Sequence, residues 1–188
     1  YDFYASNILG TLNICDAAMR FNAKKIVYIS TAAVYGNVRD EDLPITEETL
    51  VRPITPYVAS KLCGETIVEE YESRTNIMSV ILRPTIIYGP EQTEMNVIQK
   101  FMKCAMNGTP IELYGDGSHT REFLFVEDAV DAIVAAISAN EPSIGKFVIS
   151  TGEPVRLSEL AQKISMMVGD VSIRHVEKPR LISSQRYD

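Results

Sequence analysis

Apolar residues follow two different patterns along this chain, and the two patterns alternate. In one kind of segment they recur every three to four residues, which predicts helices over residues 2–21, 56–74, 93–106, 127–139 and from about 157 to 167. In the other kind they form unbroken blocks, which predict strands over residues 25–30, 77–82, 111–113, 122–125, 147–149 and 171–176. Such blocks are typical of parallel strands buried on both faces, and their alternation with helices is typical of an α/β fold.

Three of the predicted helices carry apolar stripes that we expect to face a core. In the helix at 56–74, which begins with a proline as many helices do, the stripe consists of Val58, Leu62, Ile67 and Tyr71. The acidic residues of the same helix are expected to form a solvated outer face and are Glu65, Glu69, Glu70 and Glu72. In the helix at 127–139 the expected buried residues are Val130, Ile133, Val134 and Ile137. In the last helix they are Leu157, Leu160, Ala161, Ile164 and Met167.

Two of the predicted strands end beside threonines. Thr31 lies one residue beyond the strand at 25–30. The strand at 77–82 ends at Arg83-Pro84, because proline cannot donate a hydrogen bond within a central ladder, and Thr85 follows. Open α/β sheets bind ligands at the carboxyl ends of their parallel strands. We therefore expect both threonines to lie at a ligand-binding edge.

A tyrosine and a lysine stand four residues apart near the start of the helix at 56–74. This spacing places Tyr57 and Lys61 on one face of the helix, one turn apart. An ammonium group near a phenol favours the phenolate, so the pair could accept a proton near neutral pH. The alternative is a surface helix on which Lys61 pairs with Glu65 at i,i+4.

Composition limits the kinds of partner and site. The chain has 188 residues, enough for one domain or for part of a larger protein, and its net charge of −7 argues against nucleic acid or an anionic membrane as the main partner. Three widely spaced cysteines without a Cys-x-x-Cys pair favour a reduced, cytoplasmic protein. Two histidines are too few for a metal site, and no apolar run approaches the ~20 residues of a membrane span.

Several short sequences, taken together, resemble signatures of the extended short-chain dehydrogenase/reductase family. They are Asn7-x-x-Gly10-Thr11, AVYG at 33–36, TPYVASK at 55–61, RPTIIYGP at 83–90 and YGDGSHTREFLFVEDAVDAI at 114–133. The likeness covers nearly the whole chain and is specific to the NAD-dependent nucleotide-sugar epimerases and dehydratases, of the UDP-glucose 4-epimerase type. It implies the rear part of a Rossmann-type doubly wound parallel sheet with a small α/β substrate-binding lobe. The division it implies places residues 1–88 and 122–150 in the dinucleotide-binding domain and residues 89–121 and 151–188 in the lobe.

The resemblance also implies roles for individual residues. Tyr57 would be the general base, Lys61 would lower its pKa and bind the nicotinamide ribose, and Thr31 would bridge the sugar hydroxyl and the Tyr57 oxygen. The residues implied to contact the cofactor, NAD or alternatively NADP, are Ser30, Tyr57, Lys61 and Pro84. The residues implied to contact a nucleotide-diphosphate sugar are Asn7, Thr31, Thr85, Arg121 and Arg180. Arg83 is either part of the family signature or a structural ion-pair partner.

One position argues for a particular reaction within the family. The sugar-nucleotide 4,6-dehydratases carry an Asp-Glu pair directly after the catalytic threonine, whereas this chain has Ala32-Ala33. Elimination of water then has no evident acid or base, so we expect epimerisation: oxidation at C4, rotation of the keto sugar and return of the hydride. Ile86 stands roughly where many UDP-hexose epimerases have an asparagine, so the sugar stays open.

Two alternatives remain beside the epimerase interpretation. One is a reductase or decarboxylase of the same family, and the other, from a different class, is a non-catalytic binding or dimerisation module. The latter is considered because no Gly-x-x-Gly-x-x-Gly sequence, the pyrophosphate-binding turn of the first βαβ unit, is found in the chain. We therefore expect the 188 residues alone to be inactive without an upstream cofactor-binding part. The resemblance further implies a homodimer formed through the helices at 2–21 and 56–74.

Overall fold

The computed structural model describes residues 2–38, 41, 43–93, 96–139 and 145–177. The chain divides into two compact units. Unit 1 comprises Tyr1–Gly36, Thr46–Thr85 and Val126–Ile149, and unit 2 comprises Asn37–Ile45, Ile86–Phe125 and Ser150–Asp188. Whether these units correspond to the predicted dinucleotide-binding part and substrate lobe stays a prediction.

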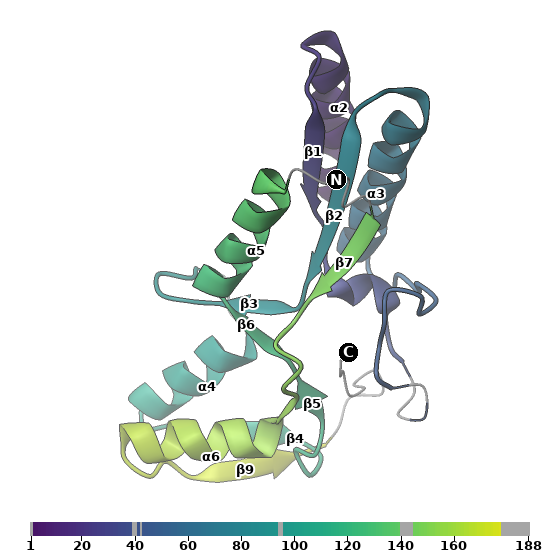
Figure 1. The fold of residues 1–188 in the computed structure, drawn as a ribbon. Coiled ribbons are helices and arrows are strands. Elements are labelled where there is room, and N and C mark those ends of the chain that lie inside the picture. Colours follow the sequence, from purple (N-terminus) through teal and green to yellow (C-terminus); the bar gives the residue numbers. More distant parts are fainter. Residues whose placement is uncertain (1, 39–40, 42, 94–95, 140–144, 178–188) are drawn as a thin grey trace. The chain divides into compact units, whose positions relative to one another are not determined.

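Unit 1 is built on a parallel sheet of three strands. The strands β1 (Lys25–Ile29), β2 (Met78–Pro84) and β7 (Gly145–Ile149) lie in the order β1-β2-β7 (Figure 1). Parallel neighbours require crossover connections, and here these contain α3 (Pro56–Arg74) and α5 (Val126–Ser138). The predicted α/β class is therefore confirmed.

Helices cover both faces of this sheet. A continuous helical segment passes from α1 (Asp2–Tyr4) through the π-helical turn η1 (Ala5–Leu9) into α2 (Gly10–Arg20), and it packs against α3. The pair α2 and α3 lies on one side of the strands and α5 on the other (Figure 1). None of the described helices is long and apolar enough to cross a membrane.

The start of α3 shows why the sequence places a helix there. Thr55 has an extended backbone, and its Oγ1 accepts a hydrogen bond from the Val58 amide at 3.2 Å. Pro56 then occupies the first helical position, where its missing N–H is not needed. The predicted bounds of this helix, 56–74, agree with the structure.

The core of unit 1 lies between the sheet and the α2 and α3 helices. It contains the buried residues Cys15, Val68, Tyr71 and Ile81. Strand β2 is buried along almost its whole length, as predicted, but β1 is only half-buried throughout. The expectation for β1 was wrong because, among the described residues, β1 pairs with β2 alone.

Two predicted apolar stripes are also only partly correct. Val130, Val134 and Ile137 of α5 are exposed, and the buried residue of this helix is Ala129. Ile133, the fourth residue of the predicted stripe, is half-buried. A small side chain therefore makes the close approach of α5, and within the described chain Val130, Val134 and Ile137 are left exposed. Met167, near the end of α6 (Leu157–Val168), is exposed as well, whereas Ala161 and Ile164 are buried as predicted.

The described part of unit 2 contains three two-stranded sheets and two helices. The parallel pairs are β3 (Ile86–Tyr88) with β6 (Phe123–Phe125) and β4 (Ile111–Tyr114) with β9 (Ile173–Val176), and the antiparallel pair is β5 (Thr120–Arg121) with β8 (Val155–Arg156). The helices are α4 (Val97–Met106) and α6. Strands β3, β5 and β8 were not predicted, and β5 and β8 are only two residues long.

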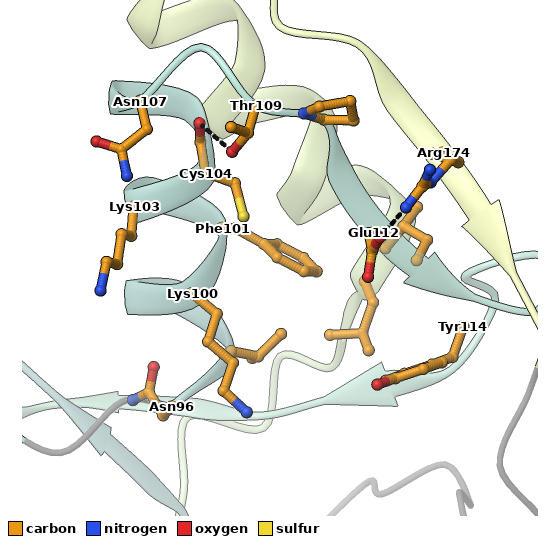
Figure 2. A pocket seen from close by; sticks show the side chains of 14 residues that line it. Asn96, Lys100, Phe101, Lys103, Cys104, Asn107, Thr109, Glu112, Tyr114 and Arg174 are labelled. Carbon is orange, nitrogen blue, oxygen red and sulfur yellow. Dashed lines mark hydrogen bonds and ion pairs between the residues drawn. The ribbon is translucent and has the colours of Figure 1, made fainter.

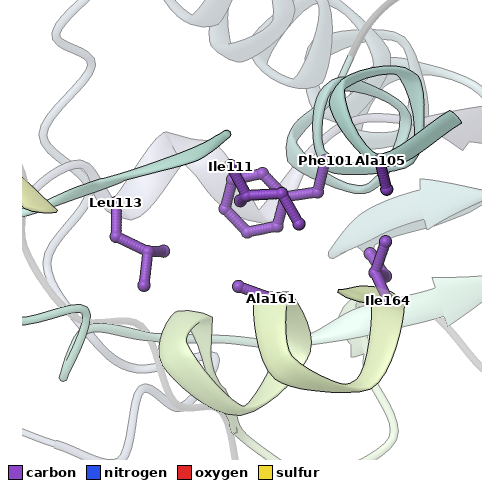
Figure 3. Close-up of a cluster of buried hydrophobic side chains, with 6 residues drawn as sticks. All are labelled: Phe101, Ala105, Ile111, Leu113, Ala161 and Ile164. Carbon is purple, nitrogen blue, oxygen red and sulfur yellow. The ribbon is translucent and has the colours of Figure 1, made fainter. Parts of the chain in front are cut away.

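Helices α4 and α6 pack on β4 through a compact apolar core. Figure 3 shows this cluster, which consists of Phe101, Ala105, Ile111, Leu113, Ala161 and Ile164. Helix α4 begins four residues later than the predicted residue 93, because the Asn96 side chain caps it by accepting from the amides of Ile98 at 2.8 Å and Gln99 at 3.3 Å.

Candidate functional site

The carboxyl edge of the unit 1 sheet carries four of the predicted site residues. Ser30 and Thr31 follow β1, Pro84 is the last residue of β2, and Thr85 follows it. Because β1 and β2 are parallel with Ile29 opposite Leu82, these residues are found at one edge. The sequence-based placement of Thr31 and Thr85 at the same edge is confirmed.

Thr31 connects this edge to a short helical turn. Its backbone is extended, with φ −156°, and its Oγ1 accepts a hydrogen bond from the Ala33 amide at 3.2 Å, which caps the 3₁₀ turn η2 (Ala32–Tyr35). The turn η2 packs against both β2 and α3. Thr31 is half-buried, and its hydroxyl donates no hydrogen bond within the described part of the chain, so the hydroxyl hydrogen is available to a ligand.

Thr85 offers a second polar group at the same edge. Its backbone amide donates to the Ile149 carbonyl oxygen at 3.0 Å and so continues the sheet beyond β2. Its side-chain Oγ1 is buried and has no hydrogen-bond partner in the described part of the chain. A buried hydroxyl without a partner is unfavourable, so this atom is suited to a ligand at the sheet edge.

Tyr57 and Lys61 lie one turn apart at the start of α3, as predicted. The Tyr57 side chain is 39% exposed, and its ring meets the Phe3 ring edge to face with centroids 5.4 Å apart. Lys61 is half-buried, and its Nζ lies 4.4 Å from the centroid of the Tyr28 ring. Burial lowers the pKa of Lys61 from its usual value, and the nearby Glu65 carboxylate partly opposes this effect.

Tyr28 supports the Lys61 turn from the sheet. Its hydroxyl donates to the Lys61 carbonyl oxygen at 3.2 Å, and burial raises its pKa to about 12, so it stays protonated as a donor at neutral pH. The Tyr28 ring fits because residue 64 is glycine. A Cβ at Gly64 would lie 2.1 Å from the Tyr28 hydroxyl oxygen. No role was predicted for Tyr28 from the sequence, where it is an aromatic residue within the predicted strand at 25–30.

Asn7 lies in the π-helical turn η1 and is directed at α3. Its Nδ2 donates to Ser60 Oγ at 2.9 Å, and Ser60 Oγ donates to the Tyr57 carbonyl oxygen at 2.7 Å. Single π turns within helices are frequent at functional sites. In this structure the Asn7 amide holds the turn of α3 that carries Tyr57, and its predicted contact with a sugar stays a prediction.

Glu65 corrects the sequence-based interpretation of α3. It was expected on the solvated outer face, but its side chain is fully buried. Arg83 binds it with two hydrogen bonds, Nε to Oε1 at 3.0 Å and Nη2 to Oε2 at 2.7 Å, and Ser30 Oγ donates to Oε1. The alternative Lys61–Glu65 surface pair is therefore wrong, and the interpretation of Arg83 as an ion-pair partner is confirmed.

A second group on Arg83 completes this buried network. Arg83 Nη1 donates to the Tyr35 hydroxyl at 2.8 Å, and the guanidinium lies 5.0 Å from the centroid of the Tyr35 ring. The role of Glu65 could not be recognised from the sequence, because other acidic residues follow it on α3. The available signal was Arg83 itself, because a charge at the end of a fully buried strand requires a partner of opposite sign.

The two arginines predicted to bind phosphate are not part of unit 1. Arg121 lies on β5 in unit 2, is half-buried, and its Nη1 donates to the Thr120 carbonyl oxygen at 2.8 Å. Arg180 lies outside the described residues. The structure thus groups Asn7, Ser30, Thr31, Tyr57, Lys61, Pro84 and Thr85 within unit 1.

Unit 2 contains a pocket of about 690 Å³ between α4 and β4. Figure 2 shows Lys100 and Lys103 on the α4 side and Tyr114 on the β4 side. Glu112 on β4 and Arg174 on β9 form an ion pair at its rim. A concave, mostly apolar volume of this size with a few polar groups is typical of a small-molecule site. The sequence analysis did not identify it.

Comparisons with known proteins agree with this arrangement. The model of the NAD dependent epimerase/dehydratase family matches residues 1–150. The chain is 34% identical to the low-salt glycan biosynthesis protein Agl12 of Haloferax volcanii, over 98% of this chain and 59% of that protein. It is 32% identical to the UDP-glucose 4-epimerase of Mycolicibacterium smegmatis, over 93% of this chain and 56% of that protein. Other relatives are dTDP-D-glucose 4,6-dehydratases.

A solved structure shows the same fold. The UDP-glucuronic acid 4-epimerase of Bacillus cereus, in complex with UDP-glucuronic acid and NAD, superposes with a TM-score of 0.86 at 26% identity, over 98% of this chain and 59% of that one. This chain therefore spans less than two thirds of the length of these relatives.

Proposed function

We propose that this chain, which belongs to the NAD dependent epimerase/dehydratase family, is the catalytic part of a nucleotide-sugar epimerase that uses NAD. The observation that carries the proposal is the Tyr57–Lys61 pair, which stands one turn apart on α3 with a half-buried ammonium. Relatives that are nucleotide-sugar 4-epimerases support the same reaction class.

In the proposed reaction Tyr57 accepts the proton of a sugar hydroxyl. The Lys61 ammonium favours the phenolate form of Tyr57, because an adjacent positive charge stabilises the anion. The Thr31 hydroxyl holds the sugar hydroxyl in line with Tyr57, and such orientation lowers the barrier to transfer. NAD supplies the hydride acceptor. After the keto sugar rotates, the hydride would return to the opposite face of C4 and Tyr57 would give its proton back to the C4 oxygen, which completes the epimerisation.

The residues at the sheet edge fit a bound dinucleotide. The buried Thr85 Oγ1 has no partner among the described residues, and Pro84 presents no backbone N–H at the end of β2. Ser30 uses its hydroxyl hydrogen on Glu65, which leaves lone pairs on its oxygen as acceptors for a ligand. We propose Thr85 as a contact of the nucleotide sugar at this edge. We propose Ser30, Tyr57, Lys61 and Pro84 as contacts of the nicotinamide end of NAD, with NADP as the alternative cofactor.

For the substrate we propose that unit 2 holds the nucleotide diphosphate. The Tyr114 ring and two lysines of α4, Lys100 and Lys103, line its pocket. These lysines give the pocket positive charge in a protein whose net charge is −7. Arg121 of the same unit is proposed to bind the diphosphate, since a guanidinium binds phosphate oxygens in pairs. Arg180 is proposed for the same role from its sequence alone.

Epimerisation is favoured over dehydration by the residues after Thr31. Ala32 and Ala33 of η2 stand beside the proposed centre, and neither can act as acid or base. A reductase or decarboxylase of the same family remains the second candidate, because the same Tyr57, Lys61 and Thr31 arrangement would serve its oxidation or reduction step.

The test is to incubate the complete protein containing this chain with UDP-glucose, UDP-galactose, UDP-glucuronic acid and NAD. An epimerase gives a mixture of C4 epimers with no net change in absorbance at 340 nm, because the hydride returns to the sugar. Stoichiometric formation or consumption of NADH would assign a reductase or decarboxylase instead, and absence of any sugar conversion would contradict both.

We further propose a homodimer formed through the segments 2–21 and 56–74. The first of these segments exposes large apolar side chains, namely Phe3, Tyr4, Leu9, Leu12, Ile14, Met19 and Phe21. Exposed apolar surface of this extent on one helical segment is typical of an interaction site.

We also propose that the protein acts in the cytoplasm. Its cysteines Cys15, Cys63 and Cys104 are free thiols, which suits a reducing compartment.

A further inference from the structure

The buried network around Glu65 joins four elements of unit 1. Glu65 is on α3, Arg83 on β2, Tyr35 on η2, and Ser30 follows β1. Each of these four side chains is at most 4% exposed. The charges of Glu65 and Arg83 compensate each other through two hydrogen bonds, and Ser30 and Tyr35 each form one further hydrogen bond, to the carboxylate and the guanidinium respectively.

Each member of the network is close in the chain to a proposed catalytic or ligand-binding residue. Ser30 precedes Thr31, and Arg83 is two residues before Thr85. Glu65 lies one helical turn beyond Lys61 and two beyond Tyr57 on the same helix. Tyr35 belongs to the turn that Thr31 caps. A shift within the network would therefore move these groups relative to one another.

A buried ion pair of this kind is weak support for stability alone. Removing two charges from water costs free energy, so replacing both partners by apolar side chains is often neutral or stabilising. Removing only one partner is strongly destabilising, because the other charge is left buried and unpaired. The pair offers directionality instead, because a bidentate guanidinium and carboxylate hold a fixed plane and distance. Apolar packing between α3 and β2 would not fix that geometry as closely.

We propose that Glu65 and Arg83, with Ser30 and Tyr35, form a positioning unit that holds Tyr57 and Lys61 of α3 in register with Thr31 at the sheet edge. This inference rests on the proposed function of those three residues. None of the four members needs to touch the substrate. They act through the elements that they join, and hydride-transfer chemistry is sensitive to displacements of about 1 Å in such groups.

The network also contributes to the charge balance around Lys61. The Glu65 carboxylate raises the pKa of Lys61 against the lowering effect of burial. The Tyr28 ring lies against Lys61 Nζ, and Tyr57 and Cys63 act in turn on Tyr28. Within the network, Arg83 and Glu47 act on Tyr35, and Glu65 and Tyr35 act on Arg83. Loss of the Glu65 charge should therefore lower the pKa of Lys61 further.

The test compares three variants by stability, lysine titration and kinetics. Glu65→Gln removes the charge with little change of shape, and Glu65→Leu/Arg83→Met removes both charges. Glu70→Gln is the matched control, since Glu70 is on the same helix but forms an exposed pair with Arg74, 3.0 Å between Oε1 and Nε. Thermal unfolding and a lysine-selective NMR titration use the 188-residue chain, and kinetics use the complete protein.

We expect the melting temperature to fall in Glu65→Gln and to return close to the wild-type value in the double variant. In both, kcat should fall about 10- to 100-fold with KM little changed, and the pKa of Lys61 should be lower. Glu70→Gln should resemble the wild type. A double variant with wild-type kcat and an unchanged Lys61 pKa would show that the network serves folding only.

Failure of the proposed function would look different. If the wild-type protein converts no nucleotide sugar, the reaction assignment is wrong, but the Lys61 titration and the melting temperatures still test the network on the chain itself. An unchanged Lys61 pKa in Glu65→Gln would then overturn the inference independently of any activity.

Discussion

Gly64 lies where α3 approaches the sheet closely. A Cβ there would lie 2.1 Å from the Tyr28 hydroxyl oxygen and 3.1 Å from the Asn7 carbonyl oxygen. The Tyr28 ring cannot easily move, because its hydroxyl is bonded to Lys61 and its face lies under Nζ. Because Gly64 has no side chain, the Lys61 turn of α3 can lie close to β1.

We predict that Gly64→Ala destabilises the protein by about 1–3 kcal/mol through overpacking, which exceeds the ~1 kcal/mol that alanine gains as a helix former. Urea unfolding measures the difference. Gly10→Ala is the control, since its Cβ would lie 3.7 Å from the Ala5 carbonyl oxygen, an ordinary contact, and it should be neutral or slightly stabilising. Equal effects of the two substitutions would contradict the contact.

Lys61 gives a prediction about pH. Burial lowers its pKa below the usual 10.5, so the unfolded chain binds the proton more tightly than the folded one. The charged Lys61 side chain lowers the free energy of unfolding, and this destabilisation is fully present at neutral pH. It is lost as pH rises from the folded-state pKa of Lys61 towards 10.5. The stability of Lys61→Met relative to wild type should therefore decline between pH 7 and pH 10.5, as measured by urea unfolding. A difference that is constant or increases with pH would contradict this cause.

For single residues, the sequence predicted where side chains lie in the fold better than which side chains they contact. The spacing of Tyr57 and Lys61 and the strand ends before Thr31 and Thr85 were sufficient to place these residues. Glu65 was assigned to solvent because helical spacing alone cannot distinguish one carboxylate in an acidic run from the next. Its partner, Arg83, is 18 residues away, and the packing of α3 against β2 brings the two together.

Among the elements, α3 has a well-defined start. Thr55, two residues before Tyr57, caps the helix because its hydroxyl oxygen accepts a hydrogen bond from the Val58 amide. We predict that Thr55→Ala lowers the free energy of unfolding by about 1 kcal/mol, the usual value of an N-cap. Thr55→Ser, which keeps the hydroxyl, is the control and should retain most of the stability. Thermal unfolding of both variants provides the measurement, and a Thr55→Ala protein as stable as wild type would exclude the cap.

Element types were predictable from the sequence because periodicity is a local property. The 3.6-residue stripes gave α2, α3 and α5, and the apolar blocks gave β1, β2 and β7. Which side of α5 is buried was not predictable, since Val130, Val134 and Ile137 form a proper stripe yet remain exposed. Of the short strands in unit 2, β6 was predicted from its apolar block, whereas β3, β5 and β8 were not, and each of these three pairs with a segment that is distant in the sequence.

For the molecule as a whole, the proposed homodimer gives a direct prediction. Ile14 of α2 is 64% exposed, and a charge at this position would be buried in the proposed interface. Ile14→Glu should convert the wild-type dimer into a monomer in sedimentation velocity experiments. Val134→Glu on α5, which is 53% exposed, is the control and should stay dimeric. A monomeric wild type, or a dimer that survives Ile14→Glu, would contradict this interface.

The central claim is that Tyr57 transfers the proton in nucleotide-sugar epimerisation. The most direct test is the kcat of Tyr57→Phe in the complete protein with its nucleotide sugar and NAD. Phenylalanine keeps the ring that contacts Phe3 and removes only the hydroxyl. We predict a fall in kcat of about 10²- to 10⁴-fold, the usual contribution of a general acid–base group, with the melting temperature unchanged. Undiminished turnover by Tyr57→Phe would contradict the mechanism.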